Sequence, residues 1–392
     1  MRRLFTLCLM CLAVSVVTAQ DDATSEGSKY NPLDPAMMSL TIAPDARGGA
    51  MGDVGAATEP DEMSQYWNPA KYAFAFSRSG IALNYTPWLR KITTGINLLN
   101  AAGYYKFGYD DNQAVSASLS YFSLGEVTVI NNDEETQQFI NPIEMSVDVG
   151  YSRMLSPSFS MAVVFRYLHS AMTYLDSDTR PSNTFAADIA AYYEAYPMVG
   201  SSECKWAWGL NISNIGGKIS YDGISSQFLP ARLRLGTSFT MPLDDYNLLS
   251  FSADADKYLI PARPKASNYA NPDEHQKALT DYYNMNGFTG LFKSFSDAPR
   301  GFAEEMEEIN WGIGAEYTYD RRFFLRAGYH HEHENKGGRK YFTFGAGIAL
   351  NVFHLDAGYV LSSEQTSALD QTLRFTLGFD LEGLRDMFGK RR

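Results

Sequence analysis

The residues best suited to metal chemistry gather in one short segment, where His330, His331 and His333 accompany Glu332 and Glu334. Imidazole nitrogens and carboxylate oxygens are common zinc ligands. In a β-strand, however, consecutive side chains point to opposite faces, so 331 and 333 would face one side and 330, 332 and 334 the other. Few of them would then reach the same ion. We therefore expect a solvated strand end here rather than a metal site.

Other motifs that would indicate catalysis or cofactor binding are missing from the sequence. Beyond residue 19 it contains no Gly-x-Ser-x-Gly, no His-Glu-x-x-His and no Cys-x-x-Cys. Asp254 and Asp256 lack the rest of a calcium-binding loop. Gly49, Gly52 and Gly55 weakly imitate a phosphate-binding loop, but no Gly-Lys-Ser or Gly-Lys-Thr follows them. We expect neither an enzyme nor a bound cofactor.

Composition narrows the class of protein. The chain has 392 residues with 45 acidic and 33 basic side chains, a formal net charge of −12, so we expect no nucleic-acid partner. Aromatic residues make up 14% of the chain, too many for a disordered protein. Beyond the N-terminus no apolar run reaches the roughly 18 residues of a membrane-spanning helix. A soluble β-protein or a transmembrane β-barrel remains.

The N-terminus has the pattern of a signal peptide, residues 1–19. Arg2 and Arg3 precede an apolar run, and Val17-Thr18-Ala19 resembles a cleavage site. After cleavage Cys204 is the one remaining cysteine, so we expect an exported chain without an intramolecular disulfide.

From residue 79 to residue 381 the sequence alternates between apolar and polar residues, the period of β-strands with two different faces. Leu373, Phe375, Leu377 and Phe379, for example, alternate with polar or small residues. The alternation predicts fourteen strands. They begin near residues 79, 95, 113, 142, 158, 183, 205, 230, 247, 309, 322, 339, 353 and 370.

The connections between these strands distinguish a barrel from a sandwich. Short and long connections alternate, and the longest covers about residues 258–308, the arrangement expected of an even-stranded outer-membrane barrel. Trp311 and Tyr319 bracket the apolar face of one strand, as membrane-interface aromatics do, although core aromatics of a soluble sandwich would also fit. We predict an all-β, fourteen-stranded antiparallel transmembrane barrel with short periplasmic turns, long extracellular loops and a periplasmic tail at 382–392.

The polar strand faces would line the lumen and carry charges of both signs. Pairing the strands on either side of each short turn places Asp148 opposite Arg166, and Asp188 could reach the other side of Arg166. The same procedure places Glu316 opposite Arg326. It places Arg234 diagonal to Asp254 and Asp256. Such cross-strand pairs neutralise a lumen and fix its register. We expect them to brace the wall, and a selectivity filter is the alternative. The predicted lumen ion pairs are formed by Asp148, Arg166, Asp188, Arg234, Asp254, Glu316 and Arg326.

Fourteen strands enclose more space than their own side chains fill. The segment 20–78 precedes the first strand, and its part from about residue 30 onward is rich in small residues, so we expect it to be an N-terminal extension and plug inside the lumen. The predicted plug motif consists of Gly48, Gly49, Gly52, Gly55, Asn68, Pro69 and Ala70.

The long loop 258–308 is distinctive. Asn271 and Pro272, followed by two acids, predict the start of a short helix that extends to Tyr283. Bulky apolar residues then cluster in an exterior loop, which favours either a protein-binding surface or a loop that folds over the barrel mouth and buries them. These candidate cargo-binding residues are Phe288, Leu291, Phe292 and Phe295.

The strings Ala43–Gly55 and Ser64–Phe74 closely resemble the PorV (LptO) family of the type IX secretion system. Asn68-Pro69-Ala70 alone is shared more widely with FadL-like barrels. The resemblance implies an outer-membrane protein that binds the C-terminal signal domain of secreted cargo at a giant translocon barrel. It would carry cargo to an attachment complex, where a sortase-like partner joins it to lipopolysaccharide. The lipid-facing wall would dock against the translocon. The alternative is a FadL-type channel for hydrophobic small molecules.

Overall fold

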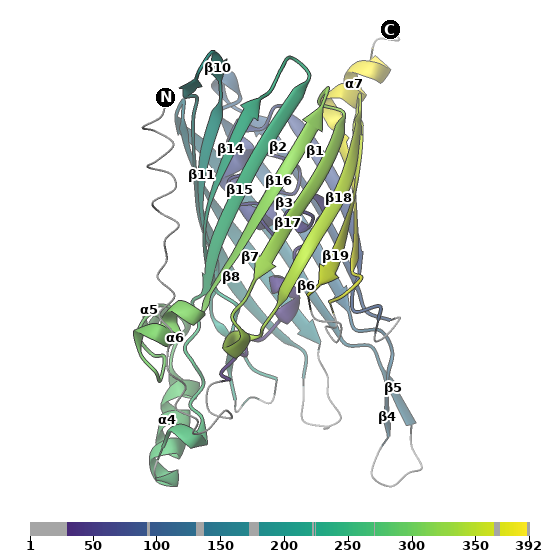
Figure 1. Ribbon diagram of the computed structural model, residues 1–392. Coiled ribbons are helices and arrows are strands. Elements are labelled where there is room, and N and C mark those ends of the chain that lie inside the picture. The colour runs from purple at the N-terminus through teal and green to yellow at the C-terminus, as the bar shows by residue number, and fades with distance from the viewer. Residues whose placement is uncertain are drawn as a thin grey trace. The chain divides into compact units, whose positions relative to one another are not determined.

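Fourteen antiparallel strands within the described residues close on themselves, with each strand paired to the next along the chain and β1 paired to β20 (Figure 1). The predicted fold class is therefore confirmed. The barrel strands are β1 (Ser79–Pro87), β2 (Asn97–Phe107), β3 (Gln113–Ser123), β6 (Ile143–Ser156), β7 (Phe159–Ala171), β8 (Ser182–Ala195), β11 (Lys205–Gly216), β14 (Arg232–Pro242), β15 (Asn247–Tyr258), β16 (Ile309–Tyr319), β17 (Phe323–His331), β18 (Lys340–Leu350), β19 (Phe353–Ser362) and β20 (Leu373–Asp380).

All helices and strands among the described residues lie in one unit, Asn31–Arg392. The predicted signal peptide, 1–19, lies outside the described residues. The computed structural model describes residues 30–91, 95–130, 137–171, 180–221, 223, 225–269, 271–363 and 369–389.

The two faces of the wall are inverted relative to a soluble protein. In β16, Trp311 and Ile313 are exposed on the outside, whereas Asn310 and Glu316 are buried on the inside. In β20, Phe375 is likewise exposed on the outer face. A sandwich would bury its apolar face, so the aromatic side chains of these strands are not core residues. Apolar residues outside and polar residues inside are the arrangement of a transmembrane barrel.

Short connections lie at one end of the barrel, the upper end in Figure 1. Asp320 and Arg321, between β16 and β17, both have positive φ angles, 53° and 52°. Two such residues form the tight turn whose twist matches a β-hairpin. The elements at this end are η5 (Tyr109–Asp111), the β9 (Met198–Val199) and β10 (Ser202–Glu203) hairpin, and helix α7 (Leu381–Gly389), which follows β20.

Long connections lie at the opposite end (Figure 1). Asn271 caps helix α4 by accepting a hydrogen bond from the Asp273 amide, and the helix ends at Asn284, one residue beyond the predicted Tyr283. The elements at this end are β4 (Val127–Ile130), β5 (Gln137–Ile140), β12 (Lys218–Ile219), β13 (Gln227–Phe228), η6 (Ala266–Asn268), α4 (Pro272–Asn284), α5 (Gly287–Lys293), α6 (Phe302–Glu307) and η7 (Glu334–Lys336).

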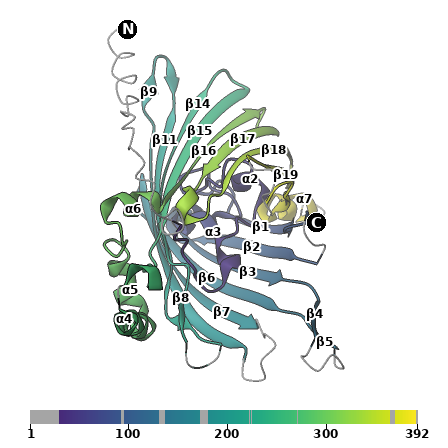
Figure 2. The same ribbon diagram turned by 60° about the horizontal axis from the view of Figure 1, so that its bottom comes forward.

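The segment before β1 lies within the ring of strands, where Figure 2 places α2 and α3. Its elements are η3 (Met38–Thr41), α2 (Ala46–Gly49), α3 (Ser64–Trp67) and η4 (Pro69–Phe74). Trp67, Lys71 and Tyr72 are almost completely buried. None of the helices in the described ranges is long and apolar enough to cross a membrane. Residues 31–75, called the plug segment below, lie inside the ring of strands (Figure 2), where most of their side chains are buried or half-buried.

Candidate functional site

Arg166 of β7 lies between two carboxylates of the neighbouring strands. Asp148 of β6 is its direct cross-strand partner, with Arg166 Nε 2.8 Å from Asp148 Oδ1. Arg166 Nη2 lies 2.9 Å from Asp188 Oδ2 on β8, and Asn214 Oδ1 accepts a further hydrogen bond from the same guanidinium. All four side chains are buried. The group joins four strands, because its contacts link β7 to β6, to β8 and to β11.

A second group of charges lies on the other side of the barrel. Arg326 Nε is 2.6 Å from Glu316 Oε2, and Arg326 Nη1 is 2.5 Å from Asp356 Oδ1. Arg47 of the plug segment also binds Glu316, with Nη2 2.8 Å from Oε1. Arg47 Nη1 also lies 3.1 Å from Asp61 Oδ2, so two guanidiniums contact three carboxylates, and the plug segment supplies Arg47 and Asp61. Arg47 was absent from the predicted set, since nothing in its local sequence indicates which strand it reaches.

Arg234 and Asp254 have other partners than the sequence predicted. Asp256 pairs with Arg232, with Arg232 Nη2 2.5 Å from Asp256 Oδ1. Arg234 lies over the Trp67 ring, with Cζ 4.5 Å from the ring centroid. Among the described residues, no carboxylate oxygen lies within ion-pair distance of Arg234. The expected pairing is replaced because the plug segment fills the space beside these strands.

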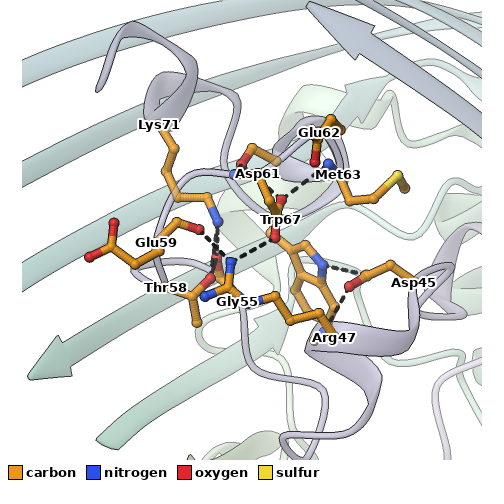
Figure 3. Close-up of polar contacts among 12 residues, drawn as sticks. Asp45, Arg47, Gly55, Thr58, Glu59, Asp61, Glu62, Met63, Trp67 and Lys71 are labelled. Atoms are coloured by element: carbon orange, nitrogen blue, oxygen red, sulfur yellow. Dashed lines mark hydrogen bonds and ion pairs between the residues drawn. The ribbon is translucent and has the colours of Figure 1, made fainter. Parts of the chain in front are cut away.

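Asp254 and Lys71 hold the turn of the plug segment that begins at Gly55. Asp254 Oδ2 accepts hydrogen bonds from the amides of Gly55 (2.8 Å) and Ala56 (2.9 Å). Lys71 Nζ donates to Gly55 O (2.8 Å) and Thr58 Oγ1 (3.1 Å), as Figure 3 shows. A carboxylate from β15 and a buried ammonium therefore fix the amide and carbonyl groups of one turn. Lys71 was not among the predicted site residues, although it is the one cation in the Asn-Pro-Ala-Lys string.

Trp67 is the centre of the plug motif (Figure 3). Its indole Nε1 donates to Asp45 Oδ1 (2.7 Å), while Asp45 Oδ2 accepts from the Gly48 amide (2.7 Å). The ring also packs on Gly48 and Gly55: a Cβ at these positions would lie 2.4 Å and 2.2 Å from ring carbons. Both contacts are shorter than side chains tolerate, so glycine is needed at both positions for the ring to fit.

Gly49 and Gly52 face the wall instead. A Cβ on Gly49 would lie 2.4 Å from Arg374 Nη1, and Arg374 donates a hydrogen bond to the Gly49 carbonyl. Gly52 has a φ of +77° and lies against the Tyr329 carbonyl oxygen, 2.5 Å from where a Cβ would be. A left-handed conformation with so little space favours glycine.

Asn68, Pro69 and Ala70 form the start of η4. Asn68 Oδ1 accepts a hydrogen bond from the Ala70 amide (3.0 Å), which is an N-cap, and Pro69 occupies the first position, where no amide hydrogen is needed. Asn68 Nδ2 donates to the carbonyls of Ala56 and Ala191, 2.9 Å each. The triplet thus joins two parts of the plug segment to β8.

The loop 258–308 exposes its large apolar residues. Phe288, Phe292 and Phe295 are 65%, 76% and 51% exposed, and Leu291 is half-buried. Helix α5 contacts the barrel strand β11 through Gly287, where a Cβ would lie 2.1 Å from the Gly216 carbonyl oxygen, and its Gly290 lies against the Phe228 ring of β13. The three phenylalanines are therefore not buried under a loop folded over the mouth.

Helix α6 extends this apolar surface with Phe302 and Met306, which are also exposed. Neither residue was among the predicted cargo-binding residues, because acidic residues lie between them in the sequence. We call Phe288, Phe292, Phe295, Phe302 and Met306 the loop apolar face.

The opposite side of α6 is fixed to the barrel by buried ion pairs. Lys257 Nζ, on β15, binds Glu305 (2.9 Å) and Glu308. Lys336 Nζ, in η7, binds Glu304 (2.7 Å) and Glu308 (2.8 Å). We call these five residues the α6 clamp. One lysine from a barrel strand and one from a loop between two strands hold one short helix, so the loop apolar face has a fixed support.

Asp297 lies between α5 and the α6 clamp. Its carboxylate accepts a hydrogen bond from the Ala262 amide, and its own amide donates to Glu305 Oε1 (3.1 Å). Burial raises the pKa of Asp297 to about 6; the negative charges of Glu308 and Glu305 also raise it, against the lowering by the Ala262 hydrogen bond.

The histidine side chains at 330 and 331 point to opposite faces of strand β17, as strand geometry requires. His330 is buried and stacks on Tyr341, with ring centroids 4.8 Å apart, whereas His331 stacks on Trp311 of the outer face at 5.0 Å. Glu332 is paired with Arg339. In the part of the chain that the structure describes, no group of three or more His, Cys, Asp or Glu side chains is arranged to hold a metal ion.

Comparison with known proteins gives a family match. The family model described as "Type IX secretion system protein PorV" matches residues 27–265, from the plug segment through β15 but short of α4. No curated protein matches the chain by sequence.

Several solved barrels are similar at low sequence identity. The toluene transporter TbuX of Ralstonia pickettii is 14% identical over 86% of this chain and 97% of its own, with a TM-score of 0.46. A FadL homologue of Pseudomonas aeruginosa is 9% identical over 86% and 99%, with a TM-score of 0.46. The toluene transporter TodX of Pseudomonas putida is 9% identical over 89% and 97%, with a TM-score of 0.47.

Proposed function

Because the chain belongs to the PorV family of type IX secretion system proteins, we propose that it binds the C-terminal signal domain of secreted cargo. As a family member it is an outer-membrane component of that system. In the proposed cycle, it receives cargo at the giant translocon barrel and carries it to the cell-surface attachment complex. There a sortase-like partner removes the signal domain and joins the cargo to lipopolysaccharide.

The proposal fixes an orientation in the outer membrane. The long-loop end, with α4 to α6, faces the cell exterior, and the short-turn end, with α7, faces the periplasm, as in other bacterial barrels. Cargo leaving a translocon meets the exterior end first. The outer wall then remains in contact with lipid or with the translocon.

The observation that carries the proposal is the loop apolar face on its rigid support. Three phenylalanines of one short segment are more than half exposed, and a cluster of that kind is typical of protein-binding surfaces. Two buried lysines hold the neighbouring helix, so ordering the loop costs little entropy when cargo binds. A signal domain with a complementary apolar surface would bury these rings.

The filled lumen supports carriage on the outside of the barrel rather than passage through it. The plug segment bonds to β15 through Asp254, to β16 through Glu316 and to β20 through Arg374. Opening a path would require several buried hydrogen bonds and ion pairs to break together, at about 1–3 kcal/mol for each group left unsatisfied.

One observation favours the second candidate, a FadL-type channel for hydrophobic small molecules. A hollow of about 680 Å³ lies at the long-loop end, within the size range of small-molecule sites. Met37, Trp88 and Phe122 give it an apolar lining, while Asp34 and Glu144 add carboxylates and Arg339 a guanidinium. A fatty acid or aromatic compound held there would satisfy this alternative.

Affinity purification of the full-length protein from native membranes distinguishes the two functions. The cargo proposal predicts co-purification of secreted proteins with intact C-terminal domains and of a large translocon barrel. Recovery of neither, together with a fatty acid in the barrel, would support the channel. Deletion of 271–300 tests the loop: cargo recovery should fall at least tenfold while heat-modifiable migration shows an intact barrel. Undiminished recovery would mean that cargo binds elsewhere.

A further inference from the structure

A hollow of about 550 Å³ lies on the outer face of the wall, across the neighbouring strands β11, β14, β15 and β16, which Figure 1 shows side by side. Trp208, Leu235 and Ile313 line it and are 48%, 53% and 50% exposed. The hollow therefore opens to the outside of the barrel rather than to the lumen. Phe159 and Ala191 extend its lining to β7 and β8. We call this hollow the wall groove.

The wall groove exists because small side chains lie between large ones in the strand register. Thr237 of β14 is the cross-strand partner of Ala253 of β15, and this pair lies between Trp208 of β11 and Ile313 of β16. In the next row of the same face, Ala255 also lies between two larger side chains. The small residues form the floor of the groove, and the larger residues form its sides.

The plug segment holds the floor of the wall groove from behind. On the inner face of these strands, a Cβ on Gly209 would lie 1.9 Å from the Ala56 carbonyl oxygen, and a Cβ on Gly312 would lie 2.3 Å from the Gly52 carbonyl oxygen. Asp254, the cross-strand partner of Gly312, accepts hydrogen bonds from two amides of the plug segment. The groove therefore keeps its shape before a ligand arrives, and binding costs little reorganisation.

The wall groove offers mainly hydrocarbon contacts. The Thr237 hydroxyl already accepts a hydrogen bond from Trp206 Nε1 (2.9 Å) and donates one to the Ala207 carbonyl oxygen (3.1 Å). A partner's β-strand would leave its backbone groups unpaired against this surface, which is costly in a membrane. The floor between Trp208 and Ile313 is only two strands wide, at about 5 Å per strand, whereas a helix with its side chains is about 10–12 Å across. A single hydrocarbon chain is the occupant that fits.

A positive charge lies on the same outer face, beyond the groove and toward the short-turn end. Arg153, near the end of β6, is exposed and is the cross-strand partner of Met161 on β7, which in turn pairs with Ala191 of the groove lining. Arg153 forms no ion pair with a carboxylate in the part of the chain that the structure describes. Arginines near the ends of membrane-spanning elements extend their charge to the level of the lipid headgroups.

We propose that the wall groove binds one acyl chain of a glycerophospholipid from the periplasmic leaflet, and that Arg153 binds the phosphate of its headgroup. The row of cross-strand partners from Ala191 to Trp311 crosses four strand spacings, about 19 Å. The row runs obliquely through the membrane, so a chain that follows it stays within one leaflet, whose hydrocarbon layer is about 15 Å thick.

The groove is continuous with the lipid-facing wall, so acyl chains surround it in the membrane. A chain inside the groove gains more dispersion contacts than one on a smooth wall, and such packing, rather than the hydrophobic effect, favours association within a bilayer. The site is independent of cargo binding at the loops. The choice of leaflet follows from the orientation proposed above.

Native mass spectrometry of the full-length protein, purified in mild detergent and mixed with phosphatidylglycerol, tests the site. We expect one phospholipid to remain bound to each protein molecule when the detergent is in excess. The mass of the ligand distinguishes a phospholipid from a fatty acid. Wild-type protein that retains no phosphatidylglycerol would overturn the proposal.

Matched variants test both parts of the site, with heat-modifiable migration as the check of folding. Ala255→Phe fills the wall groove and should lower phospholipid retention at least tenfold, whereas Ala357→Phe, at an exposed alanine of the β19 outer face, should retain the lipid. Arg153→Gln should also lower retention at least tenfold, and Arg322→Gln, at an exposed turn, should not. Equal retention by the two phenylalanine variants would show a non-specific lipid coat and contradict the groove. Full retention by Arg153→Gln would contradict the headgroup assignment.

Discussion

Arg47 and Glu316 form a two-pronged ion pair between the plug segment and the wall: Nε lies 3.0 Å from Oε2 and Nη2 lies 2.8 Å from Oε1. They are separated by 269 positions in the sequence. Glu316 also receives Arg326 from the next strand. The ion pair therefore connects the plug to a charge ladder that already braces the barrel, and displacement of the plug would leave a buried carboxylate with one partner fewer.

Arg47→Met should destabilise the barrel. Removal of one partner from a buried ion pair costs about 3–5 kcal/mol, and Arg326 offsets part of this loss, so we expect about 2–3 kcal/mol. Urea unfolding of the reconstituted protein measures the change. Arg322→Met, whose side chain is mostly exposed, should shift stability by less than about 0.5 kcal/mol. Equal effects from the two variants would show that the Arg47 contact is dispensable.

Gly55→Ala should destabilise the plug because its new methyl group would lie 2.2 Å from the Trp67 ring. Overpacking of this kind costs about 1–3 kcal/mol. In a Trp67→Leu background the smaller side chain leaves room, so the same substitution should cost less. A double-mutant cycle measured by urea unfolding gives the coupling, which we expect to exceed about 1 kcal/mol. Additive effects would argue against a direct steric contact.

Strand alternation and turn spacing were enough to predict the barrel. Asp148 lies directly opposite Arg166 because reflection about a short turn fixes register without any distant information. The same reasoning placed Glu316 opposite Arg326. Strand boundaries were less certain: the last strand was expected from 370 and begins at Leu373. Local pattern determines which residues share a hairpin.

Contacts between the plug segment and the wall could not be predicted from pattern. The partners of Arg47, Lys71 and Asp254 depend on the conformation of the plug segment. That segment has no regular hydrophobic repeat from which its conformation could be predicted. We predicted that Arg234 pairs with Asp254 or Asp256, because strand register places both carboxylates near it. In the structure the Arg234 guanidinium lies over the Trp67 ring instead. Hairpin geometry predicts contacts between neighbouring strands, but it does not predict contacts between those strands and the plug segment inside the lumen.

Lys336→Met should loosen the α6 clamp without affecting the barrel strands. Glu304 and Glu308 would lose a buried cation and draw water toward α6. Hydrogen exchange of backbone amides in 300–308 should accelerate at least tenfold, whereas amides of β16 should be unchanged. Lys293→Met, an exposed lysine on α5, is the matched control. Unchanged exchange in Lys336→Met would mean that other contacts hold the helix.

Loop stability should depend on pH through Asp297. The pKa of Asp297 is about 6 in the folded loop against an ordinary value of 3.8, so the folded loop favours the protonated carboxyl. The resulting stabilisation is complete below about pH 4, falls as the pH rises to 6, and is absent above that value. Amides in 294–300, corrected for intrinsic exchange rates, should be better protected at pH 5 than at pH 7.5.

Asp297→Asn is the control for that titration. An amide cannot ionise, so protection in this variant should change less between pH 5 and pH 7.5 than in the wild type. If both proteins show the same pH dependence, Asp297 is not the group whose titration controls the stability of the loop.

The most direct measurement for the central claim is cargo capture by a triple variant, Phe288→Ser with Phe292→Ser and Phe295→Ser. These rings are exposed, so their replacement should leave the barrel folded. Quantitative mass spectrometry of cargo co-purified from native membranes should show a loss of at least tenfold. The control is Phe76→Ser, whose ring is 99% exposed before β1 at the short-turn end, and it should retain full capture. Wild-type cargo recovery by the triple variant would contradict the proposal that the loop apolar face holds cargo.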